Sequence, residues 1–163
     1  MSQIQVVTAT DETPDEIINN LHTLYSDSGV VRYELTATRT ETYSKPKHKT
    51  LFKNGFEVKF YKYRDSLVSC LTAEYAEMHR DESKVIIRNN IIFINYEKGK
   101  TLKTEELFWY QTTRRISTDK RFVVVGKDMY ATGVGMDCDE AFDDYTAHDA
   151  YVEYDMDEKD SLR

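Results

Sequence analysis

The sequence predicts an all-β fold, in which a single elongated antiparallel sheet curls into a twisted open roll with exposed edge strands. Three observations lead to this prediction. Residues that favour strands are abundant, since the chain of 163 residues has 12 Tyr and 7 Phe but only 2 Pro. A two-strand pattern recurs further along the chain, and within each copy the spacing of the apolar residues changes once in mid-strand. Such patterns are typical of strands that stack as repeated units and bend at one place.

The repeat has a fixed offset of 31 residues, from position 71 to position 102. Its first strand matches Leu71, Ala73, Ala76 and Met78 with Leu102, Thr104, Leu107 and Trp109, and its second matches Val85 with Ile116 and Ile91-Ile92-Phe93-Ile94 with Phe122-Val123-Val124-Val125. An imperfect earlier copy is Leu35-Thr36-Ala37. Periods of this length mark architectures in which each unit buries its apolar face by stacking on the next one.

The apolar positions of the first repeated strand run i, i+2, i+5 and i+7, so their parity switches once. In a regular pleat the second pair would point to the opposite face of the sheet. An extra residue, as in a β-bulge, restores the common face and bends the strand. We expect such bulges near Glu74-Tyr75 and Glu105-Glu106. A bend that recurs in successive strands curls the sheet around an apolar trough.

The N-terminal part of the chain reads as a hairpin. Residues 1–16 are expected to be a flexible polar segment. Residues 17–25 alternate as in a strand, although a short helix that begins at Pro14 is the alternative. Residues 26–29 are of types that favour turns, and apolar and polar residues alternate again over residues 30–42.

The next segment contains two expected interruptions. Pro46, within Lys45–Lys49, cannot donate to a strand ladder and breaks the pattern. Phe52-Lys53-Asn54-Gly55-Phe56 reads as a turn, which a strand over residues 56–62 and a second turn over residues 63–66 follow.

The rest of the chain is expected to be strands joined by turns. The expected strands are residues 67–78, the two strands of each repeat copy, 129–136 and 145–154, with turns at 96–100 and 127–128. Residues 17–154 would then form one domain, and residues 155–163 an acidic tail that frays.

Charge is distributed unevenly. The formal net charge of −7 argues against a nucleic acid as the main partner. Residues 39–64 are basic and residues 137–160 are acidic. Both regions are consistent with solvated loops, but the basic one could also meet an anionic ligand or membrane surface. Its lysines Lys45, Lys47, Lys49 and Lys53 are candidates for contact with lipid phosphates.

Signals of catalysis or metal binding are weak, and we expect neither catalytic residues nor a metal or cofactor site. The four histidines are isolated, and no Ser or Cys lies in a nucleophile motif. The acidic run at 137–144 has Ala141 and Phe142 where a calcium loop needs a ligand and a glycine. Cys70 and Cys138 are too few for a disulfide framework. The sequence also lacks a run of about 18 apolar residues that would span a membrane.

The apolar residues that face the trough are the remaining candidate site. They could simply form the core of the domain. A single curled sheet has no second layer to cover its concave face, however, and an uncovered apolar trough binds something apolar.

Several stretches carry a family resemblance. They are Tyr25-Ser26-Asp27-Ser28-Gly29-Val30, Phe52-Lys53-Asn54-Gly55-Phe56, Leu71-Thr72-Ala73, Leu102-Lys103-Thr104-Glu105-Glu106-Leu107-Phe108-Trp109 and Ile116-Ser117-Thr118-Asp119-Lys120. Together they resemble the periplasmic domain of LptC, the lipopolysaccharide export protein, in the form found in Bacteroidetes. The likeness extends over residues 17–154 and is most specific in Leu107-Phe108-Trp109. The family often has Gly-Asn where this chain has Asn89-Asn90.

The resemblance implies an OstA/LptA-like β-jellyroll without catalysis of its own. Such a protein receives lipopolysaccharide from an inner-membrane ABC transporter and passes it along a periplasmic bridge of proteins with the same fold, which pair through their edge strands. It is held at the inner membrane by an N-terminal hydrophobic segment, which would precede residue 1. Residues 17–25 would be the acceptor edge and residues 145–154 the donor edge. The lipid-facing residues would be Leu35, Ala37, Leu71, Ala73, Ala76, Met78, Val85, Ile87, Phe93, Leu102, Leu107, Trp109 and Ile116.

Two other functions stay open from the sequence. A β-sandwich that binds carbohydrate or mediates adhesion would use the surface tyrosines and would not need the inward apolar residues. A hydrolase with a pair of acids is the other, but no spacing selects a pair among the many Asp and Glu residues.

Overall fold

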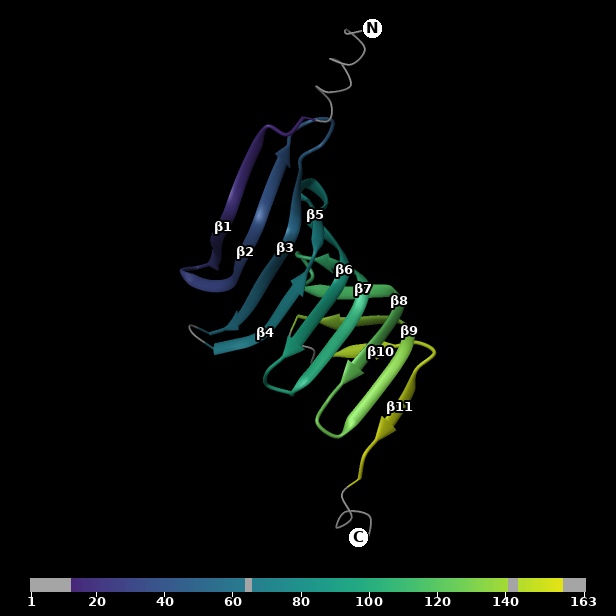
Figure 1. Ribbon diagram of the computed structural model, residues 1–163. Coiled ribbons are helices and arrows are strands. Elements are labelled where there is room, and N and C mark those ends of the chain that lie inside the picture. Colours follow the sequence, from purple (N-terminus) through teal and green to yellow (C-terminus); the bar gives the residue numbers. More distant parts are fainter. Residues whose placement is uncertain (1–12, 64–65, 141–143, 157–163) are drawn as a thin grey trace, which may run out of the picture.

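The computed structural model describes residues 13–63, 66–140 and 144–156 and contains one antiparallel sheet of 11 strands (Figure 1). The all-β prediction is confirmed. The strands are β1 (Glu16–Asp27), β2 (Val30–Tyr43), β3 (Lys49–Lys62), β4 (Ser66–Ala73), β5 (Tyr75–His79), β6 (Lys84–Asn95), β7 (Lys100–Tyr110), β8 (Arg115–Val125), β9 (Met129–Asp139), β10 (Tyr145–Ala147) and β11 (Tyr151–Tyr154), and a 3-10 turn, η1 (Arg80–Glu82), joins β5 to β6.

Apart from β4 and β5, each strand from β1 to β9 pairs with the next one along the chain, so the sheet follows the sequence. Strands β4 and β5 share one position between β3 and β6, because both pair with these two neighbours. At the far end β10 and β11 both pair with β9. Strands β1 and β11 therefore lie at opposite ends of the elongated sheet (Figure 1).

The predicted bulges are present, and they line up across neighbouring strands. The pairing register shifts in β2, β6, β7 and β8, and Glu74 separates β4 from β5. The N–H of Gly55 donates to the carbonyl of Glu74 at 3.0 Å, and the N–H of Glu74 donates to the carbonyl of Asn89 at 3.1 Å. The N–H of Asn90 then donates to the Glu105 carboxylate at 3.2 Å. This bulge row, from Gly55 to Glu105, bends consecutive strands and curls the sheet.

The residue types at the bulges explain why the chain bends there. Asparagine and glycine tolerate the left-handed backbone region better than other residues do. Along these strands the residues with positive φ are Asn20 (58°), Asn54 (65°), Gly55 (100°), Asn89 (74°), Asn90 (53°) and Gly135 (93°). Asn89-Asn90 therefore adopts a left-handed backbone conformation, which glycine would also tolerate at this place.

Two expectations about individual elements were wrong in detail. Residues 52–56 are not a turn, because β3 runs unbroken through the bulge at Asn54-Gly55. The strand expected at 67–78 is present as β4 and β5, with the expected corner at Glu74. The strand expected at 145–154 consists of β10 and β11, because His148 leaves the ladder and its N–H and C=O bond to the backbone of Gly135 and Val134. Most of the two segments expected at 1–16 and 155–163, namely residues 1–12 and 157–163, lies outside the described residues.

One hydrophobic cluster extends along the whole inner face of the sheet. It contains Leu35, Ala37, Phe52, Phe56, Val58, Phe60, Leu71, Ala73, Ala76, Val85, Ile87, Ile91, Phe93, Leu102, Leu107, Trp109, Ile116, Phe122, Val124, Ala131, Met136 and Cys138. The two halves of each repeated strand point into this cluster, as the parity switch predicts. The repeat copies are the adjacent units β4/β5–β6 and β7–β8.

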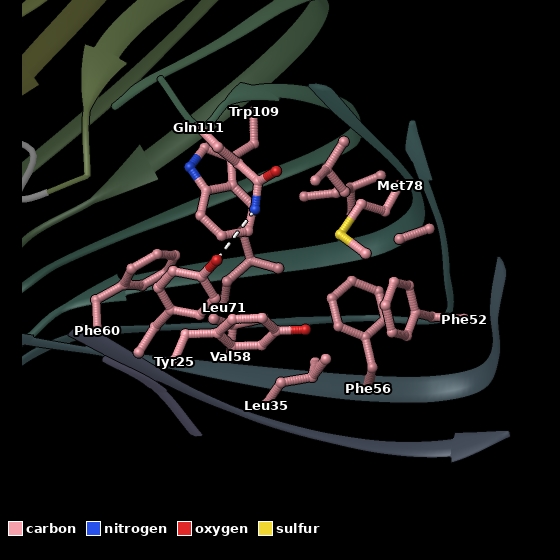
Figure 2. A pocket seen from close by; sticks show the side chains of 14 residues that line it. Tyr25, Leu35, Phe52, Phe56, Val58, Phe60, Leu71, Met78, Trp109 and Gln111 are labelled. Carbon is pink, nitrogen blue, oxygen red and sulfur yellow. Dashed lines mark hydrogen bonds between the residues drawn. The ribbon is translucent and has the colours of Figure 1, made fainter. Parts of the chain in front are cut away.

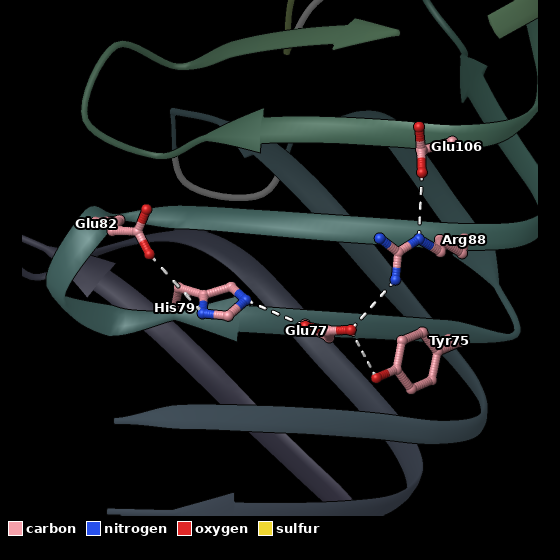
Figure 3. A network of polar contacts seen from close by, with 6 residues as sticks. All are labelled: Tyr75, Glu77, His79, Glu82, Arg88 and Glu106. Atoms are coloured by element: carbon pink, nitrogen blue, oxygen red, sulfur yellow. Dashed lines mark hydrogen bonds and ion pairs between the residues drawn. The ribbon is translucent and has the colours of Figure 1, made fainter. Parts of the chain in front are cut away.

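The outer face carries polar side chains that join neighbouring strands (Figure 3). Arg88 on β6 bonds to Glu77 on β5 and to Glu106 on β7, each at 3.2 Å. Tyr75 and His79 also contact Glu77, at 2.9 and 3.2 Å. Burial alone would raise the pKa of Glu77, but these hydrogen bonds and the charge of Arg88 hold it below its usual value. The network connects three strands across the row of bulges.

Candidate functional site

The inner faces of strands that are not neighbours meet inside the roll. Trp109 on β7 contacts Tyr33 on β2 and Phe60 on β3, with ring centroids 5.2 and 5.4 Å apart and near-perpendicular ring planes. Phe60 also packs edge-on against Phe93 at 6.3 Å. Since β4, β5 and β6 lie between β3 and β7 in the sheet, these contacts require the sheet to fold back on itself.

A small apolar cavity remains between the two walls, and we call it the chamber (Figure 2). Its volume is about 30 Å³, which is room for one or two water molecules. Its lining is Tyr25, Tyr33, Leu35, Phe52, Phe56, Val58, Phe60, Leu71, Ala76, Met78, Val85, Ile87, Trp109 and Gln111. The trough expected from the sequence is therefore largely closed, because aromatic side chains from β2, β3 and β7 fill it.

All the residues predicted to face lipid lie on this inner face, but the structure divides them into two groups. Those that line the chamber are Leu35, Leu71, Ala76, Met78, Val85, Ile87 and Trp109. Those packed elsewhere in the core are Ala37, Ala73, Phe93, Leu102, Leu107 and Ile116. Apart from Met78, which is partly buried, every one is at least 90% buried.

The sequence reasoning missed half of the chamber wall. Phe52 and Phe56 belong to the segment predicted as a turn. In the structure they lie on the inner face, on either side of the bulge in β3. The alternation of Phe56, Val58 and Phe60 already indicated an inner face. Gln111 gave no sequence signal, because it lies just past the end of β7.

Tyrosines and one polar contact close the chamber at one side, and we call this group, Tyr25, Tyr33 and Gln111, the seam. The rings of Tyr25 and Tyr33 stack at 4.5 Å. The Gln111 side-chain amide lies 3.1 Å from the Tyr33 hydroxyl (Figure 2). Burial raises the pKa of Tyr33 to about 12, so its hydroxyl keeps its proton at neutral pH. The two walls of the roll are joined here by a neutral hydrogen bond, which contributes only about 1 kcal/mol.

Lysines expected to meet lipid phosphates are partly engaged within the protein. Lys53 pairs with Glu41 at 3.0 Å, and Lys49 lies 5.1 Å above the centre of the Tyr43 ring. Lys45 and Lys47 are exposed in the β2–β3 loop.

Neither thiol has the character of a nucleophile. Cys70 and Cys138 are buried, and burial raises the pKa of Cys70 to about 11 and that of Cys138 to about 12. Within residues 13–63, 66–140 and 144–156, no group of three or more His, Cys, Asp or Glu side chains is arranged to hold a metal ion. No helix in those same ranges is long and apolar enough to cross a membrane.

The two ends of the sheet differ in character. Among the described residues, strand β1 pairs with β2 alone and exposes Ile17 and Leu24. At the other end, β11 exposes all four of its side chains, including Tyr151 and Tyr154. An unpaired edge can accept a further strand from another protein.

One of two comparisons with known proteins identifies a family for this chain. A comparison with curated protein sequences gives no significant match. The sequence model of the family described as "Lipopolysaccharide-assembly, LptC-related" matches residues 1–143. Members of that family are non-enzymatic, periplasmic components of lipopolysaccharide transport. The chain therefore belongs to the LptC-related family and takes part in lipopolysaccharide transport.

Proposed function

We propose that this domain holds the acyl chains of lipopolysaccharide inside the roll while the lipid moves from an inner-membrane ABC transporter to a periplasmic bridge protein of the same fold. The same proposal places the domain at the inner membrane, through an N-terminal segment, and assigns it no catalytic step. The observation that supports it best is the single apolar core that continues along the inner face from β2 to β9.

Burial of acyl chains gives the physical reason for such a core. Each methylene group exposed to water costs about 0.8 kcal/mol, so a lipid with several chains needs an apolar path across an aqueous compartment. The inner face offers this path, because its side chains are almost all aliphatic or aromatic. The outer face carries charged side chains, such as Arg88, Glu77 and Glu106, and would stay in water.

The closed chamber is too small for acyl chains, so binding requires the two walls to separate. The seam is the place where this separation disrupts least. It consists of partly exposed tyrosines and one neutral hydrogen bond, whereas strands that are neighbours in the sheet are joined by backbone ladders. Separation at the seam would expose Leu35, Met78 and Trp109 to an entering chain.

The sheet edges supply the contacts for handover. We assign β1 as the acceptor edge and β10–β11 as the donor edge, because both ends of the sheet can extend by strand addition. A neighbour that adds a strand at either edge would continue the inner apolar face. A photo-crosslinker at Tyr154 or at Ile17 should then capture the bridge protein or the transporter, respectively, and one at Lys120 should capture neither.

The main experiment places a photo-crosslinker inside or outside the roll. A benzophenone side chain at Phe93 or at Trp109 should capture lipopolysaccharide in cells that export it. The same group at Lys103, which is exposed on the outer side of β7, should not. Equal capture at Lys103 and at Trp109 would contradict the proposal, since the lipid would then be in contact with the outer surface.

A carbohydrate-binding module is the second candidate, and exposed tyrosines favour it. Tyr145, Tyr151 and Tyr154 are 44%, 57% and 71% exposed on β10 and β11. Aromatic side chains of this kind can stack on sugars. Binding of a soluble glycan that survives changes in the chamber and is lost in the triple variant Y145S/Y151S/Y154S would favour this candidate.

A further inference from the structure

A second cavity lies at the rim of the roll, beside the chamber, and we call it the rim cavity. Its volume is about 190 Å³. Its lining is Arg32, Phe60, Tyr61, Lys62, Val68, Arg114, Asp139 and Glu140. Phe60 forms part of the wall of both cavities. The two cavities therefore lie on either side of a shared wall residue.

Three cations border this cavity, and the residues that the structure describes neutralise them only weakly. Arg32 and Lys62 form no ion pair with any residue in the described part of the chain. Arg114 lies 4.0 Å from Asp27, and both side chains are at least half exposed. Other arginines differ, since Arg39 and Arg115 make close ion pairs with carboxylates at 2.8 and 2.9 Å.

Two acids also border the cavity, but one of them is directed elsewhere. The Glu140 carboxylate accepts a hydrogen bond from the Trp109 indole at 2.7 Å. Trp109 in turn lines the chamber, so this bond lies between the two cavities. Asp139 is the last residue of β9, is half-buried and has a partner of its own.

The two cavities together match an amphiphile whose anionic group lies next to its acyl chains. An acyl chain bound in the chamber would pass Phe60 and Trp109. The head group of the same lipid would then lie beside the three cations of the rim cavity, Arg32, Lys62 and Arg114. Guanidinium groups bind phosphate through paired charge-assisted hydrogen bonds. We propose that the rim cavity is the subsite for a phosphate group of the transported lipid; this inference rests on the proposed function of the chamber.

Binding measurements can separate the head-group subsite from the acyl-chain site. The chain has one tryptophan, Trp109, so its fluorescence reports on both cavities. We would titrate the protein with a phosphorylated lipid A, with the same lipid after removal of its phosphates, and with inorganic phosphate. The wild-type protein should bind the phosphorylated lipid about tenfold more tightly than the dephosphorylated one, which corresponds to about 1.4 kcal/mol.

The variant R32Q/K62Q/R114Q should lose this preference and still bind the dephosphorylated lipid. The matched control K103Q/R121Q/K127Q removes the same charge from exposed positions on β7, on β8 and in the β8–β9 turn, and it should keep the preference. E140Q removes a negative charge next to the subsite and keeps an oxygen that can accept the indole hydrogen bond. It should strengthen binding of the phosphorylated lipid several-fold, a gain that misfolding cannot explain.

Each other outcome overturns the subsite. Equal affinity of the wild type for both lipids, or an unchanged preference in R32Q/K62Q/R114Q, would show that the rim cavity does not bind the phosphate group. The proposal that the roll binds acyl chains would not be affected by that result. An equal loss in the control would indicate a general effect of charge. Inorganic phosphate that binds the rim cavity as tightly as the lipid would indicate a site for the free ion. If the wild type binds neither lipid, the proposed function fails as well.

Discussion

The indole Nε1 of Trp109 donates a hydrogen bond of 2.7 Å to Oε2 of Glu140. Trp109 lies on β7, and Glu140 comes directly after β9. The Ser69 hydroxyl on β4 also donates to the Glu140 carbonyl at 3.0 Å. The end of β9 is thus joined to two other strands of the sheet. Burial raises the pKa of Glu140, although the indole hydrogen bond and the charge of Arg114 oppose this effect.

This raised pKa gives the first prediction, which concerns pH. A group whose pKa is higher in the folded state stabilises the fold at low pH, and this contribution is lost as the pH rises through the folded pKa. E140Q removes the titration and should gain stability relative to the wild type as the pH increases from about 4 to 7. Urea denaturation at several pH values measures the difference. A difference that is constant or that shrinks over this range would contradict the burial of the carboxylate.

Glu41 should show the opposite dependence on pH. The hydrogen bond from Arg39 is the main cause that lowers its pKa to about 2, and Tyr43 and Lys53 also donate to this buried carboxylate against the effect of burial. The ionised group therefore stabilises the fold above about pH 4.5, and this contribution disappears as the pH falls towards 2. E41Q should cost about 2 kcal/mol at pH 7, after allowance for the partial exposure of Arg39 and Lys53.

Urea denaturation between pH 2 and 7 checks this prediction, and E97Q is its control. Glu97 is exposed in the β6–β7 turn, so its replacement should change the stability by less than about 0.5 kcal/mol at any pH. A cost of E41Q that persists unchanged at pH 2 would indicate lost packing of the side chain and not lost charge.

Two glycines should respond to alanine for different reasons. Gly55 has a φ of 100°, but the nearest atom to an added Cβ is 4.0 Å away, so G55A should cost about 1–2 kcal/mol through backbone strain alone. At Gly133 an added Cβ would lie 2.5 Å from the His148 carbonyl oxygen and 2.8 Å from the Phe122 ring. G133A should displace the segment around β10. Faster hydrogen exchange at the amides of Val134 and His148 in G133A, but not in G55A, is the expected result.

The sequence was sufficient to predict the strands and the bulges because both leave a periodic signal. The parity switch after Leu71 and Ala73 required an extra residue, and Glu74 is that residue. The continuous path of β3 was missed, because Asn54-Gly55 has the same local chemistry in a bulge as in a turn.

The closed interior could not be predicted from strand patterns. It depends on contacts between distant strands, such as Tyr33 with Trp109, and alternation shows only which face a side chain occupies. The prediction of an uncovered trough followed from the assumption that a single sheet has no opposing layer. The sheet provides its own opposing layer by folding back, with β2 and β3 against β7.

Filling the chamber should weaken lipid binding by more than the accompanying loss of stability explains. Ala76 is fully buried and lines the chamber. A76L would extend into the cavity, so overpacking should cost at most about 1–3 kcal/mol, while affinity for lipopolysaccharide falls at least tenfold. A131L is the matched control, because Ala131 belongs to the same core but does not line the chamber. Equal weakening in both variants would mean that general destabilisation, and not occupancy of the chamber, reduces binding.

A covalent link across the seam should abolish lipid binding if the walls must separate. In the variant Y33C/Q111C a short bis-maleimide can join β2 to the end of β7, at the point where the native side chains hydrogen-bond at 3.1 Å. The native thiols Cys70 and Cys138 are buried and have raised pKa values, so they should not react. Treatment of the same variant with a mono-maleimide controls for loss of the two side chains. Cross-linked protein that still binds lipopolysaccharide with the affinity of the mono-maleimide sample would show that acyl chains enter without opening the seam, by way of a sheet edge or the rim cavity.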